Sequence, residues 1–165
     1  MTEDSPKAEV KPSGALRLRA LDEDDLQVIA ACLQDALIPL REMAYMAEDE
    51  LFLASFDRFQ WERLTGQEAA SDLTVCQSIL KIDHVEAVQY RGLDGDLGGV
   101  KFELLTIKVE TFGETGLHLT LVFAGGAALR LQVRQLAVAL EDFGEPRSAN
   151  VVPKHELPTR QEEGR

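Results

Sequence analysis

The sequence has few cysteines, with Cys32 and Cys76 as the only two among 165 residues. They lie far apart and outside any C-x-x-C spacing, so the chain lacks the paired cysteines of a disulfide framework and the ligand spacing of a zinc site. Unpaired thiols are typical of a reducing compartment, where disulfides are rare. We therefore expect two reduced, buried thiols and a cytoplasmic location.

Basic residues are also scarce, with 17 Lys and Arg against 29 Asp and Glu and a net charge of −12. Residues 16–146 carry all of this charge, because residues 1–15 at −1 and residues 147–165 at +1 cancel. A surface of this sign repels phosphate backbones and anionic lipid head groups. We expect neither nucleic-acid binding nor docking on a membrane. The acidity either keeps the protein dissolved or offers an acidic face to a basic partner.

Long hydrophobic runs are absent. No stretch approaches the roughly 20 apolar residues that span a bilayer, and residues 1–14 contain no apolar run typical of a signal peptide. Proline, glycine and mixed charges without periodicity predict a disordered leader at 1–14 and a disordered tail at 147–165. Between them we expect one globular domain, residues 15–146, which is long enough to bury a sizeable core.

Motifs that carry well-known chemistry are missing as well. The chain has no G-x-x-x-x-G-K-S/T phosphate loop and no G-x-G-x-x-G between a strand and a helix. Ser55 and Ser78 lack the context of a nucleophile elbow. We therefore expect no catalytic residues and no cofactor, and the sequence favours a protein that is not an enzyme.

What the chain does contain is clear hydrophobic periodicity. Residues 16–21 alternate apolar and basic side chains, as in a strand with one wet face. Asp22 then fits a helix N-cap, followed by three acids in the first turn. One apolar stripe predicts a helix over 22–37, and Pro39 prevents its continuation.

A meander of strands is predicted to follow. The extended runs are 43–47, 51–61, 74–91 with a break at Asp83-His84, 100–112, 117–123 and 128–133. The acids at 48–50 fit a hairpin turn, and loops are expected at 63–72 and 92–99. A final helix over about 134–143 would place Leu136, Leu140 and Phe143 on one side. One long helix over 127–143 is the alternative.

Short connections between successive strands imply antiparallel pairing. The predicted fold class is α+β, a curved antiparallel sheet or partly open barrel with an N-terminal helix and a closing C-terminal helix. This order resembles pleckstrin-homology-like domains, which mostly bind peptides, proteins or lipids and are seldom enzymes. The resemblance is one of fold alone. The acidic charge argues against the phosphoinositide-binding version, and the helix at 22–37 departs from the simplest pattern.

The most distinctive segment is residues 51–62, which contain the only tryptophan and four of the ten aromatic residues. Their alternation predicts a core strand, with Arg58 paired to a carboxylate and Trp61 packed at the rim. The alternative is an exposed aromatic patch that contacts a partner. Arg58 and Trp61 are therefore candidate binding residues.

His84 and Glu86 form the second pair of candidate binding residues. On a strand they would share a face and contact each other. A surface pair is the simpler interpretation. The functional alternative is a small enzyme or small-molecule-binding protein in which His84, Glu86 and Arg58 converge in one pocket.

No metal site is expected. Asp94 and Asp96 in the glycine-rich loop have the spacing of a calcium loop, but Leu105 stands where an EF-hand requires a bidentate acid. The three histidines are predicted on separate elements, which gives a three-histidine site no support.

Several segments together resemble one known family. They are Ala20–Leu26, Gln34–Ala36, Arg58–Glu62, Leu80–Val85, Phe123–Gly126 and Leu129–Gly144. Over about residues 15–146 the chain resembles a family of alphaproteobacterial proteins of unknown function, DUF2948. The resemblance implies no activity and no catalytic residues, because the family has none assigned.

The core pattern and the lack of a polar constellation favour a small bacterial cytosolic protein with a non-catalytic role. We expect a protein- or ligand-binding or regulatory domain that acts through a sheet edge, or through a groove beside its closing helix. A homo-oligomer with a structural role is a further alternative, so the expected partners are another protein or a second copy.

Overall fold

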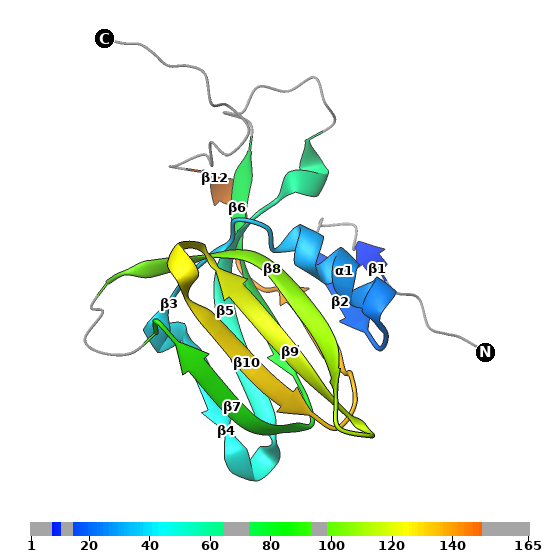
Figure 1. Cartoon of the computed structure of the whole chain (residues 1–165). Coiled ribbons are helices and arrows are strands. Elements are labelled where there is room, and N and C mark those ends of the chain that lie inside the picture. Colours follow the sequence, from blue (N-terminus) through cyan, green and yellow to red (C-terminus); the bar gives the residue numbers. More distant parts are fainter. Residues whose placement is uncertain (1–7, 11–14, 65–72, 94–98, 150–165) are drawn as a thin grey trace, which may run out of the picture.

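The computed structural model describes residues 8–10, 15–64, 73–93 and 99–149. Its twelve strands form one sheet in the order β1-β2-β11-β6-β5-β3-β8-β9-β10-β7, with β4 paired to β5 and β12 to β6 (Figure 1). The strands are β1 (Ala8–Val10), β2 (Leu16–Ala20), β3 (Leu37–Pro39), β4 (Met43–Met46), β5 (Leu51–Phe59), β6 (Thr74–Ile82), β7 (Val85–Arg91), β8 (Lys101–Phe112), β9 (Gly116–Phe123), β10 (Ala128–Val133), β11 (Val138–Asp142) and β12 (Arg147–Ser148). The helical elements are α1 (Glu23–Cys32) and the 3₁₀ turns η1 (Leu40–Glu42), η2 (Ala47–Asp49), η3 (Trp61–Arg63) and η5 (Ala124–Gly126).

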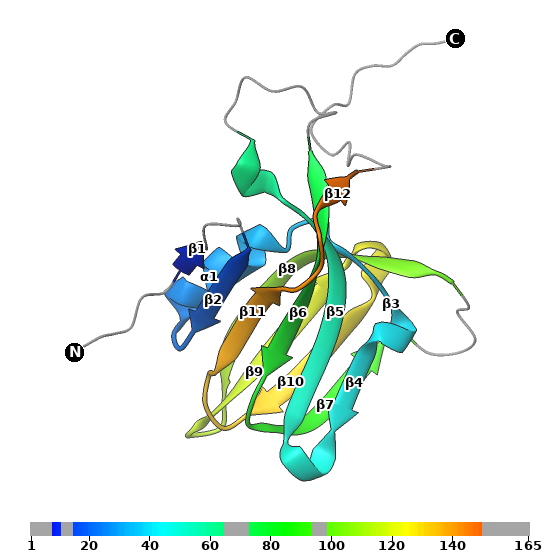
Figure 2. The same ribbon diagram turned by 180° about the vertical axis from the view of Figure 1, so that it is seen from behind.

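The sheet is antiparallel, curved and open, which confirms the predicted antiparallel sheet. One half consists of β1, β2, β11, β6 and β5, and the other of β8, β9, β10 and β7 (Figures 1 and 2). The short strand β3 joins the halves, because Leu37 pairs with Asp57 of β5 on one side and with Glu103 of β8 on the other. The core lies between these halves.

The predicted closing helix over 134–143 is wrong, and so is the alternative helix over 127–143. Residues 138–142 form strand β11 between β2 and β6. Val138, Leu140 and Asp142 are buried while Glu141 is exposed, which is the period of a strand. Phe143, which the helical interpretation buries, is 53% exposed. Without this helix, the feature on which the resemblance to pleckstrin-homology-like domains rested is gone.

Helix α1 begins as predicted and ends earlier than predicted. The Asp22 side chain caps it by accepting the Asp25 N–H at 2.8 Å. The helix ends at Cys32 because the residues that follow it lead into strand β3 and pair with the sheet. Asp35 turns with a φ of +66° and donates its N–H to the Leu104 carbonyl, and β3 follows. Within the described residues, α1 is the sole α-helix, and no helix is long and apolar enough to cross a membrane.

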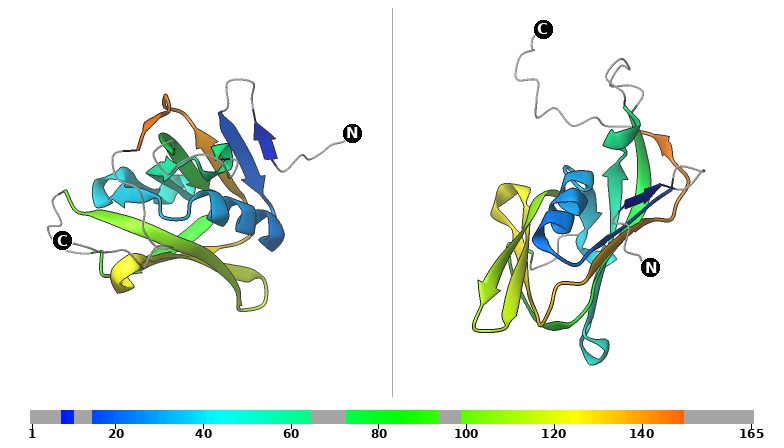
Figure 3. Two further views of the ribbon diagram at one scale, coloured as in Figure 1. Left: turned by 90° about the horizontal axis from the view of Figure 1, so that it is seen from above. Right: turned by 90° about the vertical axis from the view of Figure 1, so that its right-hand side faces the viewer.

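Packing contributes more to α1 than its cap does. The helix lies between the two halves of the sheet, against β2 and β8 (Figure 3). It fully buries Leu26 and Ile29, and Leu33, the C-cap residue that follows it, is fully buried as well. Each such side chain contributes about 1.5–3 kcal/mol, against about 1 kcal/mol for the N-cap. The helix thus completes the core at the upper end of the sheet.

The hairpin predicted around residues 48–50 is confirmed, and the break predicted at Asp83-His84 separates two strands that do not pair with each other. β4 and β5 pair around η2, where Glu50 has a φ of +53°. The break between β6 and β7 falls at His84, whose φ is +63°. Gly125 and Gly126 have φ values of +83° and +88° between β9 and β10, a region in which side chains with a Cβ are strained.

Two short strands lie within the segments expected to be disordered. β1 pairs with β2, and β12 pairs with the beginning of β6. The rest of the expected leader and of the tail lies outside the described residues. So does most of the loops expected at 63–72 and 92–99.

We predict that Leu140→Ala lowers the free energy of unfolding by about 2–5 kcal/mol, because it opens a cavity at a fully buried position of β11. Phe143→Ala is the matched control and should cost much less, since Phe143 is half exposed. Urea unfolding of both variants measures the difference. Equal losses would argue for the helical interpretation of this segment.

Candidate functional site

Arg58 of β5 is fully buried, and two carboxylates hold its guanidinium. Its Nε and Nη2 each donate to Asp142 at 2.9 Å. Its Nη1 and Nη2 donate to Glu62 at 3.0 and 2.7 Å, and Nη1 also donates to the Phe59 carbonyl at 3.3 Å. A guanidinium has five N–H donors, so this arrangement uses all of them. The predicted pairing of Arg58 with a carboxylate is confirmed, and no donor remains for a ligand.

Asp142 is held as firmly as its partner. Oδ1 also accepts the Ser78 hydroxyl at 2.5 Å, and Oδ2 accepts the Leu16 N–H at 3.1 Å. Burial alone would raise the pKa of Asp142, but the hydrogen bonds from Arg58 and Ser78 outweigh it and hold that pKa below its ordinary value. For Arg58, burial acts to lower the pKa, and the hydrogen bonds and charges of Asp142 and Glu62 raise it instead. The cluster is therefore ionised and ties β2, β5, β6 and β11 together.

Trp61 lies beside this cluster, on η3. Its ring Nε1 donates to the Gln34 carbonyl at 3.1 Å, and the ring packs against Phe59 with centroids 5.7 Å apart. With Leu73 and Val75, Phe59 forms a small apolar cluster of its own. Trp61 thus packs at the rim, as predicted, and the binding roles suggested for Arg58 and Trp61 stay predictions.

His84 and Glu86 come together through a residue that the sequence did not indicate. Arg134, just after β10, lies 3.2 Å from His84 Nδ1 through Nη2 and 3.5 Å from Glu86 Oε2 through Nη1. The same Nη1 donates to Glu50 Oε1. The left-handed backbone of His84 places it in the turn and not on the strand, so the predicted shared strand face does not apply. This is a surface cluster around an exposed arginine.

The candidate residues do not form one pocket. Arg58 pairs with Cys76 on β6, whereas Ile82, near the other end of β6, pairs with Phe52. At roughly 3.3 Å per residue, these two pairs are about 20 Å apart. His84 lies beyond Ile82, in the next turn. The structure therefore separates Arg58 and Trp61 from His84 and Glu86.

In the part of the chain that the structure describes, no three His, Cys, Asp or Glu side chains are grouped so that they could hold a metal ion. Asp94 and Asp96, the candidates for a calcium loop, lie outside the described residues. Cys32 and Cys76 are free thiols. Burial is the main reason that the pKa of each is raised, which makes both poor nucleophiles at neutral pH.

A third candidate site is a cleft between two strand edges, which we call the β4–β7 groove. It has a volume of about 280 Å³, and its lining includes Met43, Tyr45, Phe52, Tyr90, Leu93 and Leu129. No ladder joins β4 to β7 in the described sheet. Near one end, Tyr45 Oη of β4 donates to the Val85 carbonyl of β7, and the Val85 N–H donates to the carbonyl of Glu50 in the turn after β4.

The groove is suited to binding and not to acid–base chemistry. Its lining carries no charged side chain among the residues described, and tyrosine hydroxyls are its sole ionisable groups. Phe52, Leu93 and Leu129 belong to the buried core and form the floor, whereas Tyr90 is 61% exposed. The sequence offered one weak signal, a large aromatic residue among polar neighbours at the end of β7.

We predict that Arg58→Met lowers the free energy of unfolding by about 3–5 kcal/mol, because it leaves two carboxylates without their buried partner. Arg17→Met is the matched control. It removes an exposed ion pair with Glu141, with atoms 3.3 Å apart, which contributes less than about 1 kcal/mol. Urea unfolding at pH 7 compares them. Similar losses would contradict the structural role of Arg58.

We also predict a loss of stability in acid. Because folding lowers the pKa of Asp142, its contribution is fully present above the ordinary aspartate value, about 3.9, and is lost as the pH falls through the lower folded value. Unfolding free energies measured from pH 7 down to pH 2 should therefore fall more steeply below about pH 4 in the wild type than in Asp142→Asn. Asp49→Asn, at an exposed acid, should keep the wild-type profile. Parallel profiles for all three proteins would refute the assignment.

Comparison with known proteins gives one result. The model of a family described as "Protein of unknown function (DUF2948)" matches residues 16–155. No match is found among curated proteins or among solved structures. The matched residues include the Arg58 cluster, the groove and the surface cluster around Arg134. Since the match covers most of the chain, this protein belongs to the DUF2948 family of proteins of unknown function.

Proposed function

We propose that this protein is a non-catalytic binding domain that recognises an extended segment of a partner protein in the β4–β7 groove. The observation that carries the proposal is the pair of strand edges that border one apolar cleft without a ladder between them. A peptide strand supplies main-chain hydrogen-bond partners for both edges and an apolar side chain for the cleft.

The main chain provides the first support. β7 pairs with β10 alone and β4 with β5 alone, so every second residue of each strand directs its N–H and C=O away from its partner. Free edges of this kind are templates for another strand. Neighbouring strands pair at a spacing of about 4.8 Å, so an inserted segment can pair with either edge beyond the Tyr45–Val85 contact.

The side chains provide the second support, because they favour an apolar anchor. Met43 is flexible and adapts its shape to what it contacts. Tyr45 and Tyr90 offer large, rigid contact surfaces of the kind enriched at binding hot spots. We infer that the partner segment places one aliphatic or aromatic side chain in the cleft. The net charge of −12 favours a partner with basic residues around that anchor.

The proposed role has no catalytic step and is cytoplasmic. Arg58, the one candidate in the interior, has all five donors occupied by Asp142, Glu62 and a carbonyl. His84 contacts Arg134 at the surface and does not line the β4–β7 groove. The two free cysteines support a reducing compartment.

Peptides selected from a random display library against the full chain test this proposal. We expect the selected sequences to share an apolar anchor, and we expect them to shift the amide resonances of β4 and β7 in the ¹⁵N-labelled protein. Tyr90→Ala should weaken binding about tenfold or more, because it removes an aromatic wall of the groove. Met43→Lys should do the same by placing a charge in the cleft, because Met43 shares the inward face of β4 with Tyr45.

Ile79→Ala on β6 is the control, since Ile79 is a partly exposed apolar residue outside the groove lining. It should leave peptide binding unchanged. Selected peptides that shift other strands would refute the site. If the groove binds the apolar dye anilinonaphthalene sulfonate but no peptide, the proposal that its occupant is a peptide segment is refuted. A dimer whose interface maps to β4 and β7 would identify a second copy in place of a partner protein.

A further inference from the structure

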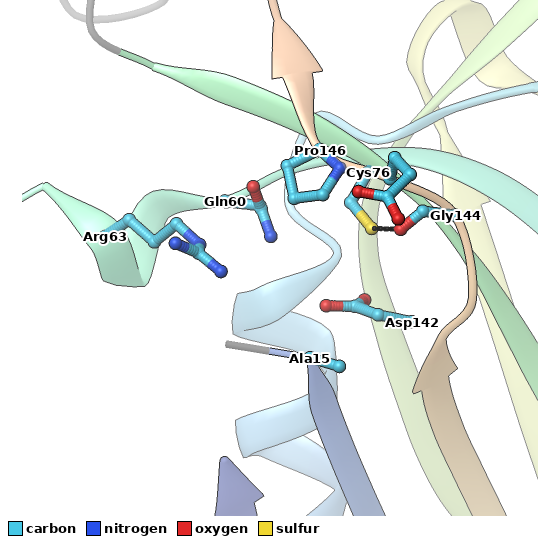
Figure 4. A pocket seen from close by; sticks show the side chains of 8 residues that line it. Ala15, Gln60, Arg63, Cys76, Asp142, Gly144 and Pro146 are labelled. Carbon is cyan, nitrogen blue, oxygen red and sulfur yellow. Dashed lines mark hydrogen bonds between the residues drawn. The ribbon is translucent and has the colours of Figure 1, made fainter. Parts of the chain in front are cut away.

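A second, polar cavity lies near the Arg58 cluster, and we call it the Gln60 pocket. It has a volume of about 100 Å³ and is bounded by the end of β5, η3, β6 and the segment that follows β11 (Figure 4). A single water molecule requires only about 10–15 Å³ of such space. The pocket therefore has room for a group of several non-hydrogen atoms.

One wall of this pocket carries a buried donor with no partner. The Gln60 side chain is 1% exposed, and its Nε2 makes no hydrogen bond with the residues that the structure describes. Its position is fixed from the other side, because Thr74 Oγ1 donates to Gln60 Oε1 and the Gln60 N–H donates to the Thr74 carbonyl. Buried amide N–H groups are nearly always satisfied. The free N–H thus points to a ligand acceptor in the pocket.

The neighbouring groups decide what kind of acceptor fits. The Cys76 thiol already donates to the Gly144 carbonyl at 3.2 Å, and Asp142 accepts four hydrogen bonds within its cluster. Figure 4 shows the guanidinium of Arg63 directed toward the same space as the Gln60 amide nitrogen. Both groups donate, so the ligand must present a hydrogen-bond acceptor to them, such as a carbonyl oxygen.

Charge then favours a neutral ligand over an anion. Among the described residues in and beside the pocket, the carboxylates of Asp142, Glu62 and Glu145 outnumber the guanidiniums of Arg58 and Arg63. A carboxylate ligand would meet this excess of negative charge in a partly enclosed site, where such repulsion is weakly screened. A neutral amide avoids the repulsion, and its own N–H groups can donate to Glu145.

We propose that the Gln60 pocket binds a primary amide, whose carbonyl oxygen accepts from Gln60 Nε2 and Arg63 and whose N–H donates to Glu145. Two sources share this chemistry: a free small amide, and the side chain of an asparagine or glutamine on a partner. The pocket is separate from the β4–β7 groove, because their linings share no residue. It is therefore a second site with its own specificity.

Acetamide and acetate, which have nearly the same shape and differ in charge, test the proposal. In ¹⁵N-labelled full-length protein at pH 7, acetamide should shift the Gln60 side-chain resonances and the Gly144 amide resonance in a saturable way. Acetate should shift them several-fold less at the same concentration. The peptide Gly-Gln-Gly, compared with Gly-Glu-Gly, tests the second source. Shifts with acetamide alone identify a free amide as the ligand, and shifts with both amides identify a pocket that also accepts a partner's side chain.

Two variants locate the effect. Gln60→Met removes the donor at nearly constant size and should reduce the acetamide shift at Gly144 at least about fivefold. Gln27→Met makes the same change at an exposed position of α1 and should leave the shift unchanged. An acetate response as large as that of acetamide would overturn the choice of a neutral ligand. If acetamide gives no saturable shift in the wild type, the pocket holds solvent only and the proposal fails, whatever the variants do.

Discussion

The fold depends on one buried guanidinium. Arg58 gives all five of its donors to groups of the protein, and its partner Asp142 also binds Ser78 and the main chain at Leu16. Burying these charges is costly unless every donor and acceptor is matched, and the geometry here matches them. The consequence for function is direct. The most conspicuous cation in the interior serves the architecture. The binding that we propose therefore uses groups left without partners in the described residues: the facing edges of β4 and β7, and the Gln60 amide nitrogen.

Local alternation was sufficient to predict most of the sheet. In segments such as 16–20 and 74–82, apolar and polar residues alternate with the period of a strand, and no distant residue is needed to interpret them. β11 was missed because its alternation includes a buried aspartate. In the local sequence, Asp142 has the pattern of a surface residue, because its buried partner Arg58 lies 84 residues away in the sequence. The helix end was misplaced for a similar reason, since β3 is set by its two neighbours in the sheet.

The sites were harder to predict than the fold, because distant segments build them. The sequence correctly predicts that Arg58 pairs with a carboxylate and that Trp61 packs at the rim of the core. It does not identify which carboxylate pairs with Arg58. Arg134 organises His84 and Glu86 from another strand end. The β4–β7 groove and the Gln60 pocket each combine residues far apart in the chain, so the sequence carries at most one weak local signal, Tyr90, for the groove.

The position of β11 also determines when this protein can fold. β11 lies between β2 and β6, so the strand that begins at Leu16 pairs with the one that ends at Asp142. During synthesis, Arg58 emerges long before Asp142, the more distant of its two carboxylate partners, and β2 emerges before its neighbour β11. Such non-local contacts make folding slow relative to helical proteins of similar length. This half of the sheet therefore closes only after almost the whole domain has emerged from the ribosome. Before that moment its strands are unpaired, and the chain is then most exposed to aggregation.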